Sequence, residues 1–433
     1  MEKSKLKRAI KAGAAILLAG VLSGCSVKFG TRKTPEVNEP ALDTVVAHPT
    51  NDERLEEMNI TYEMFRKEYK YFLVNLGIED DTDETIASYC TTQRESIIAY
   101  LINEQIILRK AREMGLYDLT EEEQREVDED FNQKIAEQIK YYGDQAEFAA
   151  DESGDDTGKS EGPVMTDEEK EALGSQKLDE MLEKCGMTRD DLHWWAQSSK
   201  ITEKLQNALG DTVPYSKAEE EFKNVQEHAK ELYNTDKVSY SMGGYDQIWL
   251  PEGSRLIKHI LIGFDDDTQS AIKTLRSDGS DEEADKKRAE EAEKLKEKQE
   301  EIEKKLDDGE DFDALIKEYS ADAAGSASSP DGYTVIPNGE TYMAEFQEAA
   351  FVPEKIGDRT TCVTDYGVHI MVYAGDAKIG DEAIKEFTDY LHAQLKSKEF
   401  SDKMSEWSAE YGFEIDYETL RLKAPEESSD STD

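Results

Sequence analysis

The feature that constrains this chain most is a change of apolar pattern in its middle. Between residues 251 and 377, short runs of Ile, Leu and Val alternate with helical stretches, in the order strand, helices, strand, helix and two strands. On both sides, apolar residues recur at the spacing of amphipathic helices. We therefore expect an α+β chain in which the C-terminal helix packs back on the N-terminal helices and the middle is an inserted domain.

The helical flanks carry periodicity and stop signals. One broad apolar stripe consists of Ile97, Ile98, Leu101, Ile102, Ile106 and Leu108. Gly115 ends this helix, and Thr120 followed by Glu123 is typical of a capping box at the start of the next helix. After residue 378 the apolar residues again recur at helical spacing, as far as Trp407.

Two histidines lie inside apolar runs of the middle segment. The chain holds only six histidines, and His259 stands in "KHILIGF" whereas His369 stands in "VTDYGVHIMVY". Side chains alternate between the two faces of a strand. His259 then shares a face with Ile257 and Leu261. His369 shares a face with Met371, so both imidazoles should point inward.

Length and charge limit the fold and the ligands. A chain of 433 residues is too long for one core and indicates about two or three domains. Lys and Arg number 52 against 98 Asp and Glu, which gives a formal net charge of -46. Because such a chain would repel nucleic acids and anionic lipid surfaces, we exclude both as ligands.

The first residues read as an export signal. A basic start, "MEKSKLKR", precedes a short apolar stretch and then "LSGC", in which small residues lead into Cys25. The order Leu-Ser-Gly-Cys resembles a bacterial lipobox, which implies cleavage before Cys25 and a lipid on its sulfur. The alternatives are an ordinary signal peptide or a single anchoring helix, but the apolar stretch is short for a membrane span.

The remaining cysteines show no metal or redox spacing. Cys90, Cys185 and Cys362 lie far apart and form no CxxC motif, so we predict neither a zinc site nor a redox-active dithiol. A disulfide between Cys90 and Cys185 stays open, although burial as small apolar residues is favoured. The acidic stretch 151–163 lacks the register of a calcium loop, and no metal is expected.

Four phrases of the middle segment occur in a specific order. They are "KHILIGF", "LDDGEDFDALIKEYSAD", "DGYTVIPNGETYMAEFQEAAFVPEKIGD" and "VTDYGVHIMVY". Together they resemble a parvulin-type peptidyl-prolyl cis-trans isomerase. The flanking "LINEQIILRKAREMGLYDLTEEE", "CGMTRDDL" and "VPYSKAEEEF" are similar to the helical chaperone domain of SurA and PrsA foldases. The resemblance implies a four-stranded antiparallel sheet with the first and last strands side by side at its centre, which would bring His259 and His369 together.

The resemblance also implies the site residues. The catalytic set would be an imidazole pair, a carboxyl and a supporting hydroxyl, namely His259, His369, Asp322 and Thr364. The substrate-binding set would be Phe346, Met343, Tyr342 and Tyr366. Met343 and Tyr342 are rivals for one place in the pocket, because the stretch before Phe346 is one residue longer than the family spacing.

Prolyl isomerisation requires little chemical equipment. Amide resonance gives an X-Pro bond a barrier of ~18–20 kcal/mol. An apolar pocket that holds the proline ring and favours the twisted amide lowers this barrier without a covalent intermediate, so no cofactor is expected.

Two departures from the family pattern stand out. The family's Gly-Gly-Asp-Leu-Gly stretch survives only as Asp331-Gly332-Tyr333. The charged run 281–306 enlarges the first helix, and we interpret it as one long solvated helix.

These features predict a lipid-anchored isomerase and foldase. A lipobox ahead of such a chaperone domain points to PrsA-like proteins on the extracytoplasmic face of a Gram-positive cell membrane. The expected partners are unfolded or newly secreted polypeptides, and Cys25 would be the only contact with the lipid membrane. The sequence leaves the oligomeric state open, a dimer included.

Two other functions remain as alternatives. One is a non-catalytic holdase with a silent parvulin domain, whose helical cleft would include Trp194 and Trp195. The other is a solute-binding lipoprotein, which would need two lobes with parallel strands. Protease, metalloenzyme and nucleotidase functions have no supporting motif in the sequence.

The predicted domains follow from these boundaries. They are a lipoprotein signal peptide (1–24), a lipid-anchored flexible tether (25–58), a helical chaperone domain (59–250) with a disordered acidic loop at about 148–167, a parvulin-type domain (251–377), a C-terminal helix completing the chaperone domain (378–422) and an acidic disordered tail (423–433).

Overall fold

The structure is a computed structural model that describes residues 39–51, 53–79, 81–151 and 165–422. The described chain divides into two compact units. The helical unit comprises the residues up to Val213 together with those from Lys396 onward, and the sheet unit comprises Pro214–Leu395. The chain therefore passes between the units twice, the second time inside one helix.

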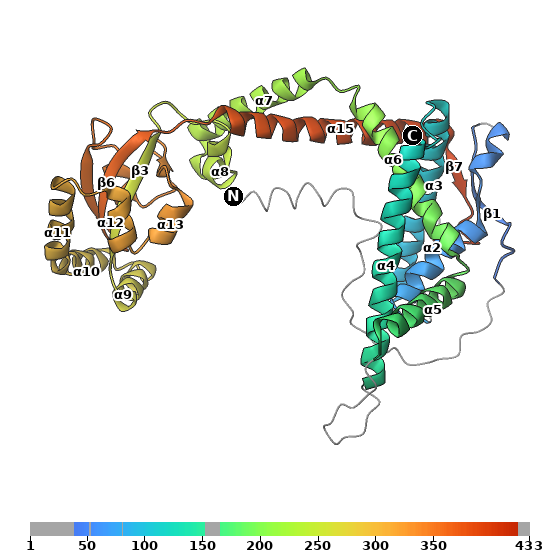
Figure 1. Ribbon diagram of the computed structural model, residues 1–433. Coiled ribbons are helices and arrows are strands. Elements are labelled where there is room, and N and C mark those ends of the chain that lie inside the picture. The colour runs from blue at the N-terminus through green and yellow to red at the C-terminus, as the bar shows by residue number, and fades with distance from the viewer. Residues whose placement is uncertain (1–38, 52, 80, 152–164, 423–433) are drawn as a thin grey trace, which may run out of the picture. The chain divides into compact units, whose positions relative to one another are not determined.

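Figure 1 labels elements of both units where there is room. The helical unit contains β1 (Val45–Pro49), η1 (Glu53–Met58), β2 (Ile60–Thr61), α2 (Tyr62–Asn75), α3 (Ala87–Glu113), α4 (Glu121–Asp151), α5 (Asp167–Cys185), α6 (Arg189–Gly210), the second part of α15 (Asp381–Tyr411) and β7 (Phe413–Ile415). The sheet unit contains α7 (Tyr215–Thr235), α8 (Lys237–Met242), η2 (Tyr245–Gln247), β3 (Arg255–Gly263), α9 (Asp266–Ser277), α10 (Asp281–Lys294), α11 (Lys296–Asp307), α12 (Phe312–Tyr319), α13 (Ala323–Ser328), β4 (Tyr333–Val335), α14 (Ala344–Ala349), β5 (Arg359–Thr364), β6 (Gly367–Asp376) and the first part of α15.

The helices predicted before the central segment are present in the structure. In α3 the stripe from Ile98 to Leu108 is buried. At the start of α4, the N–H of Glu123 donates to Oγ1 of Thr120 at 3.2 Å, and the N–H of Thr120 donates to Oε2 of Glu123 at 2.8 Å, which confirms the capping box. Trp407 of α15 packs on the same cluster as α2 and α3. The second part of α15, from Lys396 onward, therefore packs back on the N-terminal helices.

A small antiparallel sheet joins the two ends of the described chain. Its strand order is β2-β1-β7, and Ala47 of β1 lies opposite Ile415 of β7. Val46 and Ala47 are each 1% exposed. The prediction of a flexible tether is therefore wrong for residues 45–49 and 53–58, which form β1 and η1. A strand this short shows no clear periodicity, and its partner lies near the other end of the chain.

A buried ion pair fixes the C-terminal residues to the first helices. Asp81, between α2 and α3, accepts a hydrogen bond from the Tyr69 hydroxyl at 2.7 Å and one from Nη1 of Arg94 at 3.1 Å. Arg421, beyond β7, also pairs with Asp81. Arg94 is only 6% exposed. Replacing Asp81 by a neutral residue would therefore leave the charge of Arg94 uncompensated in the core.

Two carboxyls interact inside the helical unit. Glu68 of α2 and Glu104 of α3 are both half-buried. Burial and the neighbouring Glu104 raise the pKa of Glu68 to about 8, against the effect of a hydrogen bond from Trp195 of α6. Burial also raises the pKa of Glu104. Both carboxyls therefore hold their protons more tightly than exposed glutamates do.

The central sheet has the order β4-β3-β6-β5, and all of its pairs are antiparallel. At its centre His259 of β3 lies opposite Met371 of β6, and Leu261 lies opposite His369. This confirms the predicted α+β fold with a four-stranded antiparallel sheet. The strands that the structure describes pair only in antiparallel fashion, whereas the solute-binding alternative requires parallel ones.

The two faces of this sheet bury different cores. On one face Ile257 and Met371 pack against Phe346 of α14. The opposite face packs on α11 and α12 through Ile260, Ile262, Val368, Ile370, Ile302 and Leu315. His259 and His369 belong to the first face, because they alternate with the residues of the second.

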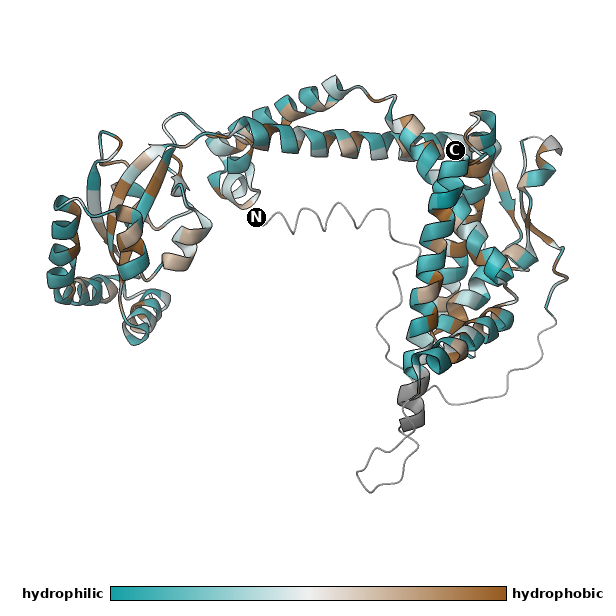
Figure 2. Cartoon of the chain, in the orientation of Figure 1, coloured by the Kyte–Doolittle hydropathy of each residue, from teal (hydrophilic) through white to brown (hydrophobic). Residues whose placement is uncertain are grey.

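The charged run 281–306 differs from the single solvated helix that we predicted. It forms two helices, α10 and α11, which meet at Leu295. Figure 2 shows both helices as largely hydrophilic, yet Ala284 and Ile302 are 0% exposed. Leu295 and Leu306 also pack against the sheet. The prediction is wrong because the thin apolar stripe is buried, and the chain bends at Leu295 to keep both helices against the core.

The sheet unit begins earlier than the predicted boundary at residue 251. It includes α7 and α8, which we expected in the helical chaperone domain, and the first part of α15. Ala229 of α7 and Tyr240 of α8 are both 0% exposed and pack with Ile336, just after β4. Phe222 of α7 contacts Phe387 of α15, with ring centroids 6.0 Å apart. Helical periodicity does not reveal on which core a helix packs.

Some predictions fall outside the described residues. These concern the signal peptide 1–24, Cys25, most of the acidic loop 148–167 and the tail 423–433. Cys90 and Cys185 are buried thiols in different clusters, and Cys362 is half-buried. Within the part of the chain that the structure describes, no helix is both long and apolar enough to cross a membrane.

Candidate active site

A row of hydrogen-bonded polar side chains lies on the α14 face of the central sheet. Oγ1 of Thr364 lies 2.8 Å from Nε2 of His369, and Nδ1 of His369 lies 2.8 Å from Nδ1 of His259. Nε2 of His259 lies 2.9 Å from Oδ2 of Asp322, which also accepts the Tyr333 hydroxyl at 2.6 Å. The structure therefore brings the four predicted catalytic residues together and adds Tyr333.

One assignment of protons satisfies this row with both imidazoles neutral. The Tyr333 hydroxyl and Nε2–H of His259 donate to the carboxylate of Asp322. Nδ1 of His259 then accepts from Nδ1–H of His369, whose Nε2 accepts from the Thr364 hydroxyl. All four imidazole nitrogens are thereby occupied. Neither ring can act as a nucleophile or a base unless the row is broken.

Burial keeps both imidazoles neutral. His259 and His369 are each 5% exposed. Burial, with a smaller contribution from His259, lowers the pKa of His369 to about 3. Burial also lowers the pKa of His259, although Asp322 acts in the opposite direction. Burial and the bond to Asp322 raise the pKa of Tyr333, so its hydroxyl keeps its proton at neutral pH.

Local contacts hold Asp322 beside β3. The N–H of Ala321 donates to the carbonyl of Leu261 at 2.8 Å. Oγ of Ser320 accepts from the N–H groups of Leu261 and Asp322, both at 3.1 Å. A Cβ at Gly325 of α13 would lie 2.3 Å from both Asp322 and the Tyr333 hydroxyl. The small residues of this stretch therefore leave room for the Asp322–Tyr333 bond.

The turn between β5 and β6 positions the other end of the row. Thr364 ends β5 and His369 stands near the start of β6. The Thr364 oxygen accepts the N–H of Tyr366 at 3.2 Å, which fixes the hydroxyl for donation to His369. Gly367 has φ 149°, and a Cβ there would lie 2.2 Å from the carbonyl oxygen of Ile262. Only glycine allows β3 to approach so closely.

An aromatic wall borders the imidazoles. The Phe346 ring stands edge-on to both, with centroids 5.3 Å from each. The Tyr342 ring lies 5.3 Å from Phe346, and its hydroxyl donates to the carbonyl of Thr334 at 3.1 Å. Met343 is the half-buried N-cap residue of α14. Tyr366 is 55% exposed, so it stands outside this wall. The substrate-binding roles of all four residues stay predictions.

Two arginines connect the β5–β6 turn to the helices next to the site. Arg288 of α10 pairs with both Glu345 of α14 and Asp365 of the β5–β6 turn. Arg276 of α9 binds Asp365 through Nε and Nη2, each at 3.1 Å. The Asp365 side chain is 18% exposed, so water screens this bidentate pair less than it screens a surface pair. The enlarged charged region therefore ties the turn to α14.

Sequence reasoning missed Tyr333. The residue stands in Asp331-Gly332-Tyr333, where the family pattern is lost. The structure pairs Tyr333 of β4 with Ile257 of β3. Opposite residues of paired strands share a face, and Ile257 shares its face with His259. Placing β4 beside β3 in the correct register would have pointed to Tyr333.

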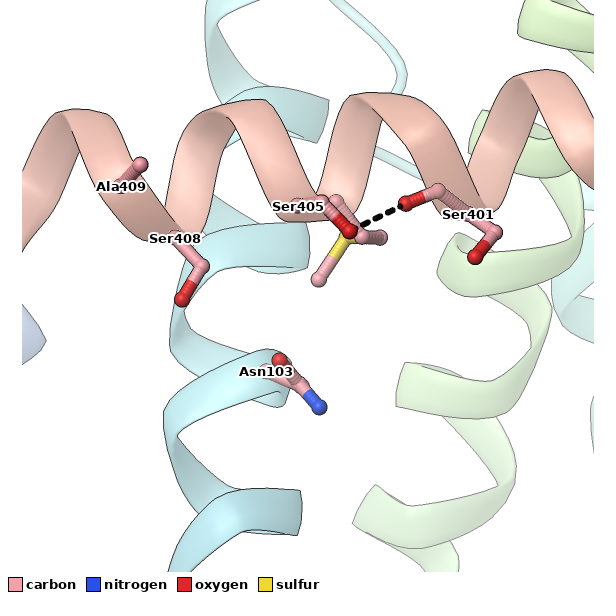
Figure 3. A pocket seen from close by; sticks show the side chains of 6 residues that line it. Asn103, Ser401, Ser405, Ser408 and Ala409 are labelled. Atoms are coloured by element: carbon pink, nitrogen blue, oxygen red, sulfur yellow. Dashed lines mark hydrogen bonds between the residues drawn. The ribbon is translucent and has the colours of Figure 1, made fainter.

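The helical unit has a hollow that is lined mainly by small polar side chains (Figure 3). It lies along α3 and α15 and is lined by Asn103, Ser401, Met404, Ser405, Ser408 and Ala409. Oγ of Ser405 donates to the carbonyl of Ser401 at 3.0 Å. Small polar side chains do not provide the apolar cleft that a holdase needs. Trp194 and Trp195, which we expected in such a cleft, lie in two different packed clusters.

Comparisons with known proteins give one family match, inside the sheet unit, and several similar proteins. Residues 249–376 match the family model of the PPIC-type PPIase domain. The foldase protein PrsA of Oceanobacillus iheyensis is 28% identical over 142 residues, which cover 30% of this chain and 46% of that protein. The foldase protein PrsA of Caldanaerobacter subterraneus subsp. tengcongensis is 38% identical over 109 residues, which cover 25% of this chain and 35% of that protein. The matches thus span less than half the length of these relatives.

A solved structure is also similar. The crystal structure of a peptidylprolyl isomerase, PrsA, from Bacillus cereus aligns with 84% of this chain and 92% of its own, at 16% identity and a TM-score of 0.23. The family match covers the whole central sheet, from β3 to the end of β6, and the complete imidazole row. Residues 249–376 are therefore a PPIC-type PPIase domain of the parvulin type, in a chain that is similar to the PrsA foldases.

Proposed function

We propose that this chain catalyses cis-trans isomerisation of X-Pro bonds and thereby assists the folding of secreted polypeptides. The observation that carries the proposal is the row of Thr364, His369, His259 and Asp322, bordered by Phe346, inside a matched PPIC-type PPIase domain. Similarity to proteins named foldase supports unfolded or newly secreted polypeptides as the substrates.

The proposed chemistry is non-covalent. We propose that the proline ring contacts the half-buried Tyr342 and the small exposed part of Phe346, whose exposed fraction is 5%. The neutral imidazoles beside Phe346 add no charge. A peptide bound there loses the water that stabilises its planar amide. The free energy of the twisted amide therefore falls relative to that of the planar ground state. This difference is what lowers the barrier.

Exposure separates the roles within the row. The Asp322 side chain is 34% exposed, whereas that of His259 is 6% exposed. We therefore assign to Asp322 the contact with the rotating peptide. The two histidines and Thr364 are assigned the task of holding Asp322 and the aromatic wall in place.

The test is a protease-free exchange measurement by NMR on the full chain with a short proline peptide. Asp322→Asn keeps an acceptor for His259 and removes the charge, and we expect isomerisation to slow about tenfold or more. Phe346→Leu should raise KM, because part of the apolar wall is lost. Arg359→Met serves as the control: Arg359 stands on β5 and makes a surface pair with Asp307 of α11, so this change should leave both values unchanged.

The same assay separates the isomerase from the holdase. If the folded wild type gives no rate above the uncatalysed exchange, yet suppresses aggregation of an unfolded protein, the isomerase assignment is wrong. The chain would then be a holdase with a silent parvulin domain.

We also propose an extracytoplasmic location with a lipid on Cys25, supported by the lipobox-like sequence and by similarity to PrsA proteins. A labelled fatty acid should enter the wild type but not Cys25→Ala, and the variant should leave the membrane fraction. Labelling of both proteins, or unchanged fractionation, would contradict the anchor.

A further inference from the structure

Helices α7 and α8 with η2 lie outside the matched residues 249–376, yet they pack on a loop of the candidate site. We call residues 336–343, between β4 and α14, the pocket loop. It carries Tyr342 and Met343, the two rivals for the pocket wall. The loop contains no helix or strand, so contacts from other elements fix its shape.

An apolar cluster anchors the start of the pocket loop. Ile336 is 5% exposed and packs with Ala229 of α7 and Tyr240 of α8, which are both 0% exposed. Tyr233 and Trp249 pack against the same cluster. Without these helices, Ile336 would face water and its burial would be lost.

Two hydrogen bonds extend this contact along the pocket loop. The Tyr233 hydroxyl donates to the carbonyl of Pro337 at 2.8 Å. Oγ1 of Thr341 donates to Oγ of Ser241 in α8 at 3.0 Å. Thr341 directly precedes Tyr342, so the second bond lies one residue from the aromatic wall.

An electrostatic contact reaches the wall itself. Burial raises the pKa of Tyr342 to about 12, with a smaller contribution from the negative charge of Asp246 in η2. Burial also raises the pKa of Asp246. The segment outside the matched domain therefore lies within electrostatic range of Tyr342.

One residue of the pocket loop has a left-handed backbone, and α14 also contacts the loop. Asn338 has φ 50°, in the left-handed region that asparagine tolerates better than most residues. On the α14 side, Nε2 of Gln347 donates to the carbonyl of Ile336 at 2.7 Å. The loop is thus held between α14 on one side and the α7–α8 segment on the other.

We propose that Tyr233 and Ser241 are positioning residues of the isomerase site, which hold the pocket loop so that Tyr342 stays against Phe346. This inference rests on the proposed function. It extends the working isomerase beyond residues 249–376 to include α7 and α8. It also means that the helices before β3 set how tightly the proline ring is bound.

The experiment compares Tyr233→Phe with Tyr319→Phe in the full chain. Both changes keep the ring and remove one hydroxyl, but the Tyr319 hydroxyl bonds to Glu301 at 2.9 Å on the opposite face of the sheet. We expect Tyr233→Phe to raise KM for a proline peptide about fivefold, the factor that one net hydrogen bond gives, with kcat nearly unchanged. Tyr319→Phe should leave KM unchanged.

Hydrogen exchange supplies a readout that does not depend on activity. The amides of residues 339–343 should exchange about fivefold faster in Tyr233→Phe than in the wild type. Ser241→Ala should act in the same direction, and Ser241→Thr, which keeps the hydroxyl, should restore wild-type exchange. These serine variants keep the test valid if Tyr233→Phe fails to fold.

The outcomes separate this inference from the proposed function. Wild-type KM and wild-type loop exchange in both Tyr233→Phe and Ser241→Ala would overturn the positioning role, whatever the isomerase rate. If the wild type is inactive, but hydrogen exchange of the pocket loop still depends on Tyr233 and Ser241, the proposed function is refuted. The inference that these two residues position the pocket loop is then still supported. A raised KM together with faster exchange supports both.

Discussion

Acidification should shift the stabilities of the two units in opposite directions. In the sheet unit, burial lowers the pKa of His369 to about 3, against ~6.5 for an unfolded histidine. As the pH falls, the unfolded chain binds this proton first. The contribution of His369 is therefore present above about pH 6.5 and is lost as the pH falls toward the folded pKa.

The helical unit behaves in the opposite way. Burial raises the pKa of Glu68 to about 8, against ~4.3 for an unfolded glutamate. Here the folded state binds the proton first. The contribution of Glu68 is complete below about pH 4.3 and is lost as the pH rises through about 8.

The size of both effects follows from proton linkage, at about 1.4 kcal/mol for each unit of pKa. Between about pH 7.5 and pH 5.5, His369 alone should remove about 1 kcal/mol from the stability of the sheet unit. Over the same range Glu68 should add about 2 kcal/mol to the helical unit, reduced by solvent screening because the side chain is half-buried. His259 and Glu104 act in the same directions as their neighbours.

Hydrogen exchange measured by mass spectrometry, corrected for the intrinsic pH dependence of exchange, can follow each unit separately. Protection should fall in β3 and β6 and rise in α2 and α3 as the pH decreases. Glu68→Gln should flatten the trend in α2 and α3 and leave that in β3 and β6. The reasoning is refuted if both units change in the same direction, or if Glu68→Gln leaves the helical trend intact.

Three substitutions test the packing of the sheet unit. Thr364→Val should cost about 1–3 kcal/mol in urea unfolding, because Nε2 of His369 loses its buried donor; an unchanged midpoint would contradict the proton assignment. Gly367→Ala should lower the thermal midpoint by the equivalent of about 1–3 kcal/mol or more, since its Cβ meets the carbonyl of Ile262. Ile302→Ala, in a helix that we expected to be solvated, should cost about 2–5 kcal/mol by calorimetry, and a loss below about 1 kcal/mol would speak against burial of α11.

Local patterns made the centre of the fold predictable. The alternation around His259 and His369 depends on neighbouring residues only, so it indicates that each imidazole points inward. That the two strands lie side by side was implied by the family resemblance. The capping box at Thr120 is equally local. Asp322 could be placed because the phrase "YSAD" stands at a fixed point of a family pattern.

Features set by distant contacts were not predictable. β1 becomes a strand through a partner near the C-terminus, and no short-range pattern marks that choice. Tyr333 joins the row through the register of β4, in a stretch where the family pattern fails. The hydrogen bond from Tyr233 to the carbonyl of Pro337 forms because α7 packs on the core of the sheet unit. The spacing of apolar residues in α7 would be the same if the helix packed on the other core. Leu295 marks a bend that packing on the sheet imposes.

The pairing of β1 with β7 sets an order of events for a chain that leaves the ribosome N-terminus first. Ala47 cannot meet Ile415, and Asp81 cannot meet Arg421, until almost the whole described chain has emerged. The sheet unit is continuous in sequence and can close before that point. In the interval β1 has an unpaired edge, and such edges invite aggregation. The edge of β1 that pairs with β7 therefore stays open until the last described strand is available.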